Sequence, residues 1–233
     1  MRNNLITRIF VIGLLATAWA SAPAQVVKQG NGFLLRMKYT KGAIAKYTMT
    51  TTSVASAGIP AMNMAMPMET KVLSVLKGVG EVQYTVGPVT NNGKAMGQKQ
   101  VVVTKVDARG KMLSSSGMAQ QLNNVTFPEG AIKPGGSWSG VQSSQSAMGA
   151  MNMNATYTFV GLKSIGGKMC AEIKVAVSGG NAMIKTNGTG SVFLLVSDGS
   201  LQSTHLAQDM RMDTGQKGAK PMQLKMTVKI TRK

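Results

Sequence analysis

Cysteine, histidine and acidic side chains are scarce in this 233-residue chain, which contains one Cys, one His and eight Asp plus Glu residues. A single thiol, Cys170, cannot form an internal disulfide, so the fold has to be stabilised by a packed core. So few carboxylates, and one imidazole on His205, leave little material for acid–base catalysis or for a metal site built from such side chains. The composition therefore predicts a protein that is not an enzyme and holds no cofactor.

Aromatic residues and long apolar segments are scarce as well. Aromatics make up 5% of the chain. No run after residue 24 approaches the about 18–20 apolar residues that a membrane-spanning helix needs. The formal net charge is +18, but the lysines are spread along the sequence and no nucleic-acid-binding motif accompanies them. These features predict no transmembrane anchor and no nucleic acid partner, and they favour an anionic envelope surface as a partner.

Residues 1–24 have the composition of an export signal. Two arginines precede an apolar stretch over 9–20, and the small-residue sequence A-P-A stands before Gln25. Cleavage at this point would start the mature chain at Gln25. We therefore expect an exported protein, periplasmic or extracellular, in which residues 25–233 form a single β-rich domain.

Apolar and polar residues alternate with a period of two through much of the chain. The segments 33–39, 46–50, 82–86, 169–177 and 222–231 show this pattern. A period of two is typical of strands that bury one face. The pattern predicts a mainly β protein of about ten strands, folded as a curved antiparallel sheet or half-barrel. The one helix that we expect is short and covers residues 115–123.

Glycine-containing turns separate the predicted strands. Asp198-Gly199 has the composition of a two-residue hairpin turn, and Gly110 predicts a second hairpin. The stretches Lys77-Gly78-Val79-Gly80 and Ser164-Ile165-Gly166-Gly167 predict turns that serve the same purpose.

An internal repeat is present. Residues 68–89 and 154–177 each contain a strand, a basic glycine turn and a second strand, and a methionine cluster precedes each of them. The chain therefore divides into two related meanders, over about 33–114 and 137–231. We expect the two meanders to share one core.

Three further stretches carry a resemblance to a known family. They are Y-x-x-G-x-x-x-x-Y at 39–47, FPEGAIKPGGSW at 127–138, and GTGSVFLLVSDG at 188–199. On these stretches the chain resembles an uncharacterised family of exported bacterial β-rich proteins, a domain of unknown function that offers no catalytic residues to carry over. Its architecture is in turn similar to the half-barrel of lipoprotein carriers. That similarity implies a curved sheet with a concave apolar face.

Segments that resemble catalytic motifs each miss a requirement. GSWSG has Trp138 where a nucleophile elbow has its serine. Ser74 and Lys77 match S-x-x-K, but in a strand these two side chains point to opposite faces. GLKSIGGK has Gly167 where a phosphate-binding loop has its lysine. These departures agree with a protein that is not an enzyme.

Methionine is abundant, with 19 residues in the chain. The first cluster contains Met62, Met64, Met66 and Met68, and the second contains Met151 and Met153. One interpretation is that these six side chains line or gate an apolar groove, because methionine is unbranched and adapts to irregular partners. The alternative is a copper(I) site in which Met62, Met64, Met66 and Met68 supply thioether ligands.

The sequence therefore predicts a non-catalytic exported envelope or periplasmic protein that binds a lipid-like or other hydrophobic ligand on a Met-rich apolar face. Two alternatives remain open. One is a periplasmic copper(I)-binding protein that uses the Met-rich segments, and the other is a structural surface protein of unknown function without a small ligand.

Overall fold

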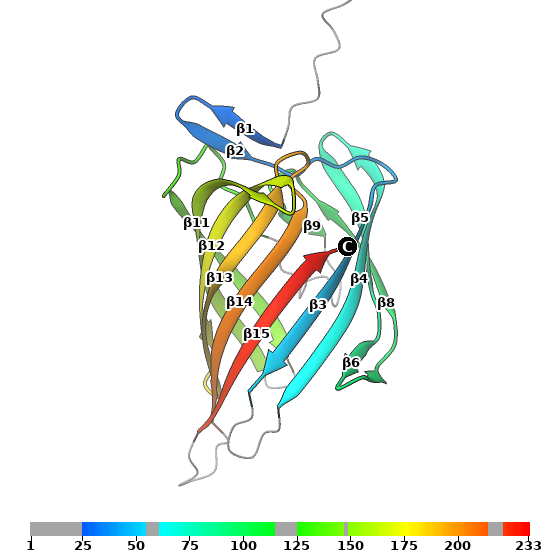
Figure 1. Ribbon diagram of the computed structural model, residues 1–233, viewed down its shortest axis with the longest axis vertical. Helices are drawn as coiled ribbons and strands as arrows, with labels where there is room; N and C mark the ends of the chain where they lie inside the picture. The colour runs from blue at the N-terminus through cyan, green and yellow to red at the C-terminus, as the bar shows by residue number, and fades with distance from the viewer. Residues whose placement is uncertain (1–24, 55–60, 115–124, 147–148, 214–220) are drawn as a thin grey trace, which may run out of the picture.

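A computed structural model describes residues 25–54, 61–114, 125–146, 149–213 and 221–233 (Figure 1); for 142–146 and 149–151 it describes the backbone alone. The described residues form fifteen β-strands and no helix. The mainly β, antiparallel fold predicted from the alternation is confirmed. The helix predicted over 115–123 lies outside the described residues.

The first nine strands belong to the N-terminal half of the chain. They are β1 (Val26–Gln29), β2 (Gly32–Leu35), β3 (Ile44–Ser53), β4 (Met62–Leu76), β5 (Val79–Val86), β6 (Val89–Asn91), β7 (Lys94–Met96), β8 (Gln100–Val106) and β9 (Met112–Ser114). Strands β1, β2, β6, β7 and β9 have only three or four residues. Such short strands show no clear alternation in the sequence, which explains why the prediction of about ten strands was too low.

The remaining six strands are long and follow one another in the C-terminal half. They are β10 (Ser137–Ser146), β11 (Gly149–Ile165), β12 (Lys168–Gly180), β13 (Ile184–Leu195), β14 (Leu201–Met212) and β15 (Met222–Arg232).

One antiparallel sheet contains every strand except β1 and β2. Its order is β10-β11-β12-β13-β14-β15-β3-β4-β5-β8-β9, and β6 and β7 attach beside β4. The last strand of the chain, β15, pairs with β3 and so joins the C-terminal meander to the N-terminal one. In the described residues β10 does not pair with β9, and the sheet is an open, curved half-barrel rather than a closed one (Figure 1).

A register shift interrupts the β4–β5 hairpin and the β11–β12 hairpin. It falls between Val72 and Ser74 where β4 pairs with β5, and between Phe159 and Gly161 where β11 pairs with β12. A bulge of this kind bends its strand and increases the local twist. Both shifts therefore contribute to the curvature of the sheet.

Three of the four predicted turns are confirmed. Within the predicted stretches 77–80 and 164–167, the turns are the pairs Lys77-Gly78 and Gly166-Gly167, because Val79 already begins β5 and Ile165 still belongs to β11. Both residues of each pair have positive φ, which suits the twist of the flanking strands. Gly110 has a φ of 80°. In the same turn the Asp107 carboxylate accepts hydrogen bonds from two of the following backbone N–H groups.

The turn at Asp198-Gly199 is longer than the predicted two residues. Residues 196–200 connect β13 to β14. The Asp198 carboxylate accepts hydrogen bonds from the backbone N–H and the hydroxyl of Ser200, at 2.8 and 2.5 Å, and the Asp198 carbonyl accepts one from the backbone N–H of Lys38 at 2.9 Å. A dipeptide turn signal cannot predict a loop that is shaped by such a distant contact.

The hydrophobic core fills the concave face of β11, β12 and β13. Phe159 and Ile173 point into it and are 0% exposed. The β1–β2 hairpin covers these strands, and the Phe33 ring lies 5.4 Å from the Phe159 ring. Phe127, which precedes β10, is buried in the same cluster. This half of the concave face is therefore closed by the chain's own side chains.

Candidate functional site

The concave face over β15, β3, β4, β5 and β8 contains a cavity of about 680 Å³. Its wall includes Met37, Tyr47, Met49, Met66, Met68 and Tyr84. Small-molecule sites in proteins commonly enclose about 300–1,000 Å³ and have mostly apolar linings. We therefore treat this cavity as the candidate functional site.

A second cavity, of about 670 Å³, lies beside Ser53, Gly188 and Met226. Its lining contains Asn, Gln, Asp, Lys and Thr but no aromatic side chain. This wall offers less apolar surface to a ligand than the wall of the first cavity.

Strand register explains why apolar side chains from several strands meet in the first cavity. Ile230, Met49 and Met66 are successive partners on β15, β3 and β4. Tyr47 and Met68 are partners in the row two residues away. Because side chains alternate between the two faces of a strand, every second residue of each strand points to the same concave surface.

Residues 36–43, which we call the strap, cross one end of the sheet between β2 and β3 (Figure 1). The Tyr39 ring packs against Gly80 of β5, at a position where any Cβ would overlap the ring. The Tyr39 hydroxyl donates a hydrogen bond of 3.1 Å to the Asp107 carbonyl. Burial raises the pKa of Tyr39, which keeps the hydroxyl in its neutral, donating form.

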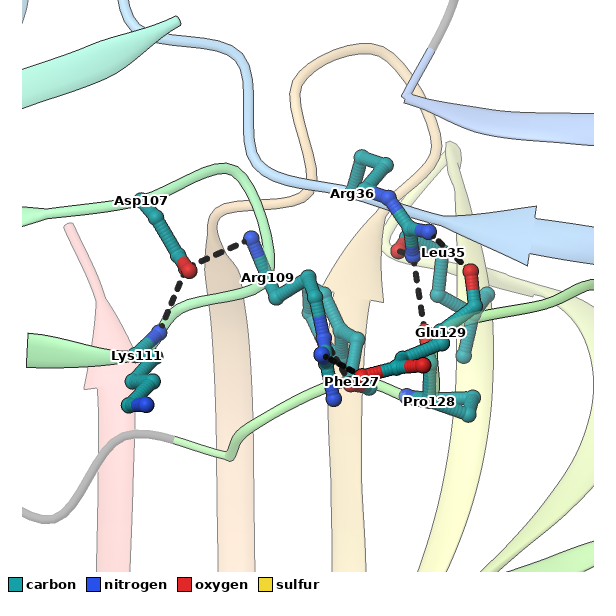
Figure 2. A network of polar contacts seen from close by, with 8 residues as sticks. All are labelled: Leu35, Arg36, Asp107, Arg109, Lys111, Phe127, Pro128 and Glu129. Carbon is teal, nitrogen blue, oxygen red and sulfur yellow. Dashed lines mark hydrogen bonds and ion pairs between the residues drawn. The ribbon is translucent and has the colours of Figure 1, made fainter.

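Two arginines reach the segment before β10, Arg36 from the start of the strap and Arg109 from the β8–β9 turn (Figure 2). The Arg36 guanidinium donates to the carbonyls of Pro128, at 2.9 Å, and Glu129. The Arg109 guanidinium donates to the Phe127 carbonyl at 2.9 Å and pairs with the Glu129 carboxylate at 2.8 Å. Burial and the charge of Arg109 lower the pKa of Arg36. The contacts of Arg36 fix the start of the strap, whose residues 37–39 line the cavity.

A group of polar side chains lies at the end of the cavity beside the strap. Arg232, the last residue of β15, lines the cavity and donates a hydrogen bond of 2.7 Å to the Ser200 hydroxyl. That hydroxyl in turn donates to Asp198. Burial raises the pKa of Tyr47, and the positive charge of Arg232 opposes the rise. The cavity therefore combines a broad apolar wall with a small charged region at one end.

The methionines predicted to line a groove lie in different places. Met66 and Met68 line the cavity, whereas Met62 and Met64 lie further along the same face of β4, outside the lining. Met153 lies on β11, and five strands separate that strand from β4 in the sheet. The side chain of Met151 lies outside the described residues. The two methionine clusters therefore do not line one common cavity in the described part of the chain.

The sequence analysis did not assign several other residues that line the cavity to the site. Met49 alternates with Tyr47 on β3, and the alternation in 46–50 predicted that it lies on the apolar face of its strand, but not that it belongs to the site. Met37 comes from the strap and Met96 follows the β6–β7 turn. No local pattern indicated that these two segments, or Arg232, would meet at one site.

The single histidine and the single cysteine lie outside the site. His205 is exposed on β14 opposite Lys229. Cys170 is free and 0% exposed, and burial raises the pKa of its thiol although Lys168 opposes the rise. Cys170 is therefore a core side chain rather than a reactive one.

The described part of the chain contains no group of three or more His, Cys, Asp and Glu side chains that could hold a metal ion. Within the same ranges, no helix has the length and apolar character needed to cross a membrane.

No family model matches the sequence, and no curated protein matches it. Several solved structures are similar. A predicted lipoprotein from Parabacteroides distasonis has a TM-score of 0.43 at 12% identity, over 84% of this chain and 95% of that chain. The hypothetical lipoprotein YmcC from Escherichia coli has a TM-score of 0.31 at 12% identity, over 98% and 97%. A predicted exported protein with a YmcC-like fold from Bacteroides fragilis has a TM-score of 0.35 at 10% identity, over 83% and 96%.

Proposed function

We propose that this protein is a non-catalytic exported protein that binds a hydrophobic, lipid-like ligand in the cavity over β3, β4 and β5. The observation that carries the proposal is a cavity of about 680 Å³ whose lining includes five Met, three Tyr and four Val side chains. An apolar ligand that removes this wall from water gains about 25 cal/mol for each Å² that is buried.

The residue types of the wall suit a ligand of variable shape. Met49, Met66 and Met68 are half-buried and come from two neighbouring strands. A thioether side chain is unbranched and polarisable, so it can change rotamer to follow an irregular or flexible partner. An acyl chain is a partner of that kind.

The outer face of the sheet supports contact with an anionic envelope surface. Lys71, Lys105, Lys225 and Lys229 are exposed and alternate with side chains that point to the concave face. Each lysine close to an anionic lipid surface contributes about 1 kcal/mol of attraction. The same protein can thus carry an apolar ligand on one face and lie against an anionic surface with the other.

Ala45→Trp is expected to weaken the binding of a hydrophobic probe at least about tenfold, which corresponds to about 1.4 kcal/mol. Ala45 lies on the cavity wall in β3, so an indole ring at this position would occupy the space of the ligand. The measurement is a titration with N-phenyl-1-naphthylamine, whose fluorescence rises in an apolar site. Urea unfolding of the same sample checks that the variant is folded.

Val101→Trp is the matched control for this experiment. Val101 is 53% exposed on β8 and does not line the cavity. Its substitution adds the same indole ring outside the proposed site. The control should bind the probe as the unaltered protein does. If folded Ala45→Trp binds as tightly as the control, the cavity does not bind the probe and the proposal is wrong.

Copper(I) binding is a second candidate function, because several thioethers share one wall. Met49 and Met66 are direct cross-strand partners, and Met37, Met68 and Met96 line the same cavity. A soft monovalent copper ion accepts thioether ligands.

Replacing Met49, Met66 and Met68 together with leucine separates the two candidates. Leucine keeps the apolar surface and removes the sulfur, so we expect the affinity for the hydrophobic probe to change by less than about threefold. Competition with a copper(I) chelator measures the metal in parallel. The copper(I) function would be favoured if the unaltered protein binds copper stoichiometrically and the triple variant does not. A Met62→Leu/Met64→Leu variant should then still bind copper. A protein that binds neither probe nor copper would favour the structural role.

A further inference from the structure

The cavity that we propose as the ligand site carries an uncompensated positive charge at one end. Its charged lining residues are Lys38, Glu69, Asp198 and Arg232. Glu69 forms an ion pair of 3.8 Å with Lys46, its cross-strand partner. After this pair is set aside, two cations and one carboxylate remain at the cavity. The charge at this end therefore favours an anion.

The one carboxylate that remains is occupied by its own loop. Asp198 accepts hydrogen bonds from the backbone N–H and the hydroxyl of Ser200. The ion pairs of the described residues are Lys46–Glu69, Arg109–Glu129 and Lys163–Glu172. Arg232 belongs to none of them.

Arg232 differs in this respect from the two arginines, Arg36 and Arg109, that contact the segment before β10. Arg36 and Arg109 each donate to two groups or more of the segment before β10. Arg232 donates one hydrogen bond, to Ser200, out of the five N–H donors of a guanidinium. It is half-buried beside an apolar wall. A cation in such a position gains most from a partner that is itself charged and planar.

The apolar wall begins directly beside this cation. Arg232 is the cross-strand partner of Tyr47, and Tyr47 is the partner of Met68. Met49 and Met66 form the next row of the wall. A ligand with an anionic head at Arg232 would therefore place its apolar part over the thioether side chains without a gap.

We propose that the ligand is a single-chain amphiphile with a terminal carboxylate, such as a long-chain fatty acid. Its carboxylate pairs with the Arg232 guanidinium beside Ser200, and its acyl chain lies over Met49, Met66 and Met68. This inference rests on the proposed function and names the ligand class for that site. A carboxylate matches the fork of a guanidinium through two parallel hydrogen bonds.

The test compares ligands of equal chain length that differ only in the head group. The assay measures how well oleate, oleyl alcohol and oleyl phosphate each displace N-phenyl-1-naphthylamine from the full chain. Each ligand is used below the concentration at which it forms micelles. We expect oleate to bind at least about tenfold more tightly than oleyl alcohol, because only oleate can form a charge pair with Arg232 in a site partly shielded from water. Arg232→Gln should reduce this ratio to within about twofold and leave the affinity for oleyl alcohol unchanged.

Arg211→Gln is the matched control, because it removes the same charge from the exposed face of β14, away from the cavity. The control should keep the preference for oleate, which would exclude a general effect of net charge. Arg232→Lys keeps the charge without the fork and should retain part of the preference. Thermal unfolding of each variant checks the fold.

The outcomes distinguish this inference from the proposed function. Equal binding of oleate and oleyl alcohol, unaffected by Arg232→Gln, would overturn the assignment of the head group while the hydrophobic site stands. Tighter binding of oleyl phosphate than of oleate, dependent on Arg232, would overturn the carboxylate in favour of a phosphate head. Failure of all three ligands to displace the probe would overturn both proposals.

Discussion

Phe159→Ala is expected to lower the free energy of unfolding by about 3–5 kcal/mol, as the removal of a buried aromatic ring commonly does. The Phe159 side chain is 0% exposed and lies between β11 and the β1–β2 hairpin. Phe33, its ring partner in the hairpin, is tied to Ile132 by two backbone hydrogen bonds of 2.8 and 2.9 Å. The hairpin therefore cannot move easily to fill the space. Urea unfolding followed by circular dichroism measures the loss.

Phe193→Ala is the matched control, because Phe193 lies on β13 and points to the opposite face of the sheet. Its ring is half-exposed, and the Lys163 ammonium lies 5.8 Å from the ring centroid. Its removal should cost about 1 kcal/mol or less. Equal losses for the two variants would show that the concave face over β11–β13 is not the main core.

Gly199→Ala is expected to destabilise the protein by about 2–4 kcal/mol, because two unfavourable effects add at this position. Gly199 has a φ of 69°, a conformation that costs energy for a residue with a Cβ. The added Cβ would also overlap the Arg36 carbonyl, where the strap passes the β13–β14 loop. The variant should therefore loosen the strap from this loop. The change in urea midpoint measures the effect.

Gly30→Ala separates the two contributions. Gly30 has a φ of 58°, but nothing lies within 4 Å of the position of its Cβ. The control should therefore lose only the conformational part, about 1–2 kcal/mol. A loss at Gly199 no larger than the loss at Gly30 would mean that the strap does not pack closely against this loop, and the described contact between them would be wrong.

These two variants act on different parts of one sheet. Phe159 lies in the half that the chain fills with its own side chains, whereas Gly199 lies beside the half that contains the cavity. The filled half supplies a stable frame, and the strap connects that frame to the cavity wall through Arg36 and Lys38. A binding site that is left partly unfilled needs such a frame, because it contributes little packing of its own.

Local signals in the sequence predicted the elements that depend on local geometry. The alternation in 222–231 placed Leu224 inward and Lys225 outward, and the structure buries the first and exposes the second. A turn within 77–80 was also predicted, and the structure places it at Lys77-Gly78. At Asp198-Gly199 the same type of signal gave a turn that was too short, because the contact with Lys38 comes from a distant segment.

The candidate site could be predicted only in part. Met66 and Met68 were identified because they stand in a methionine cluster. Met37 lies in the alternating segment 33–39, which predicted a strand rather than a site residue, and no motif marks Arg232. Cross-strand register and the path of the strap bring these four side chains to one cavity. Both depend on which strands pair, and a pattern within one strand does not contain that information.

The sequence by itself determined a mainly β protein whose strands each present one apolar face, because side chains of a strand alternate with a fixed period. It also determined an outer face rich in lysine. Only the tertiary structure decided which half of the concave face is filled and which is left open. The physical reason is that β1–β2 and Phe127 cover β11–β13 through long-range contacts, and the chain supplies no comparable cover for the wall of Met49, Met66 and Met68 in the residues described.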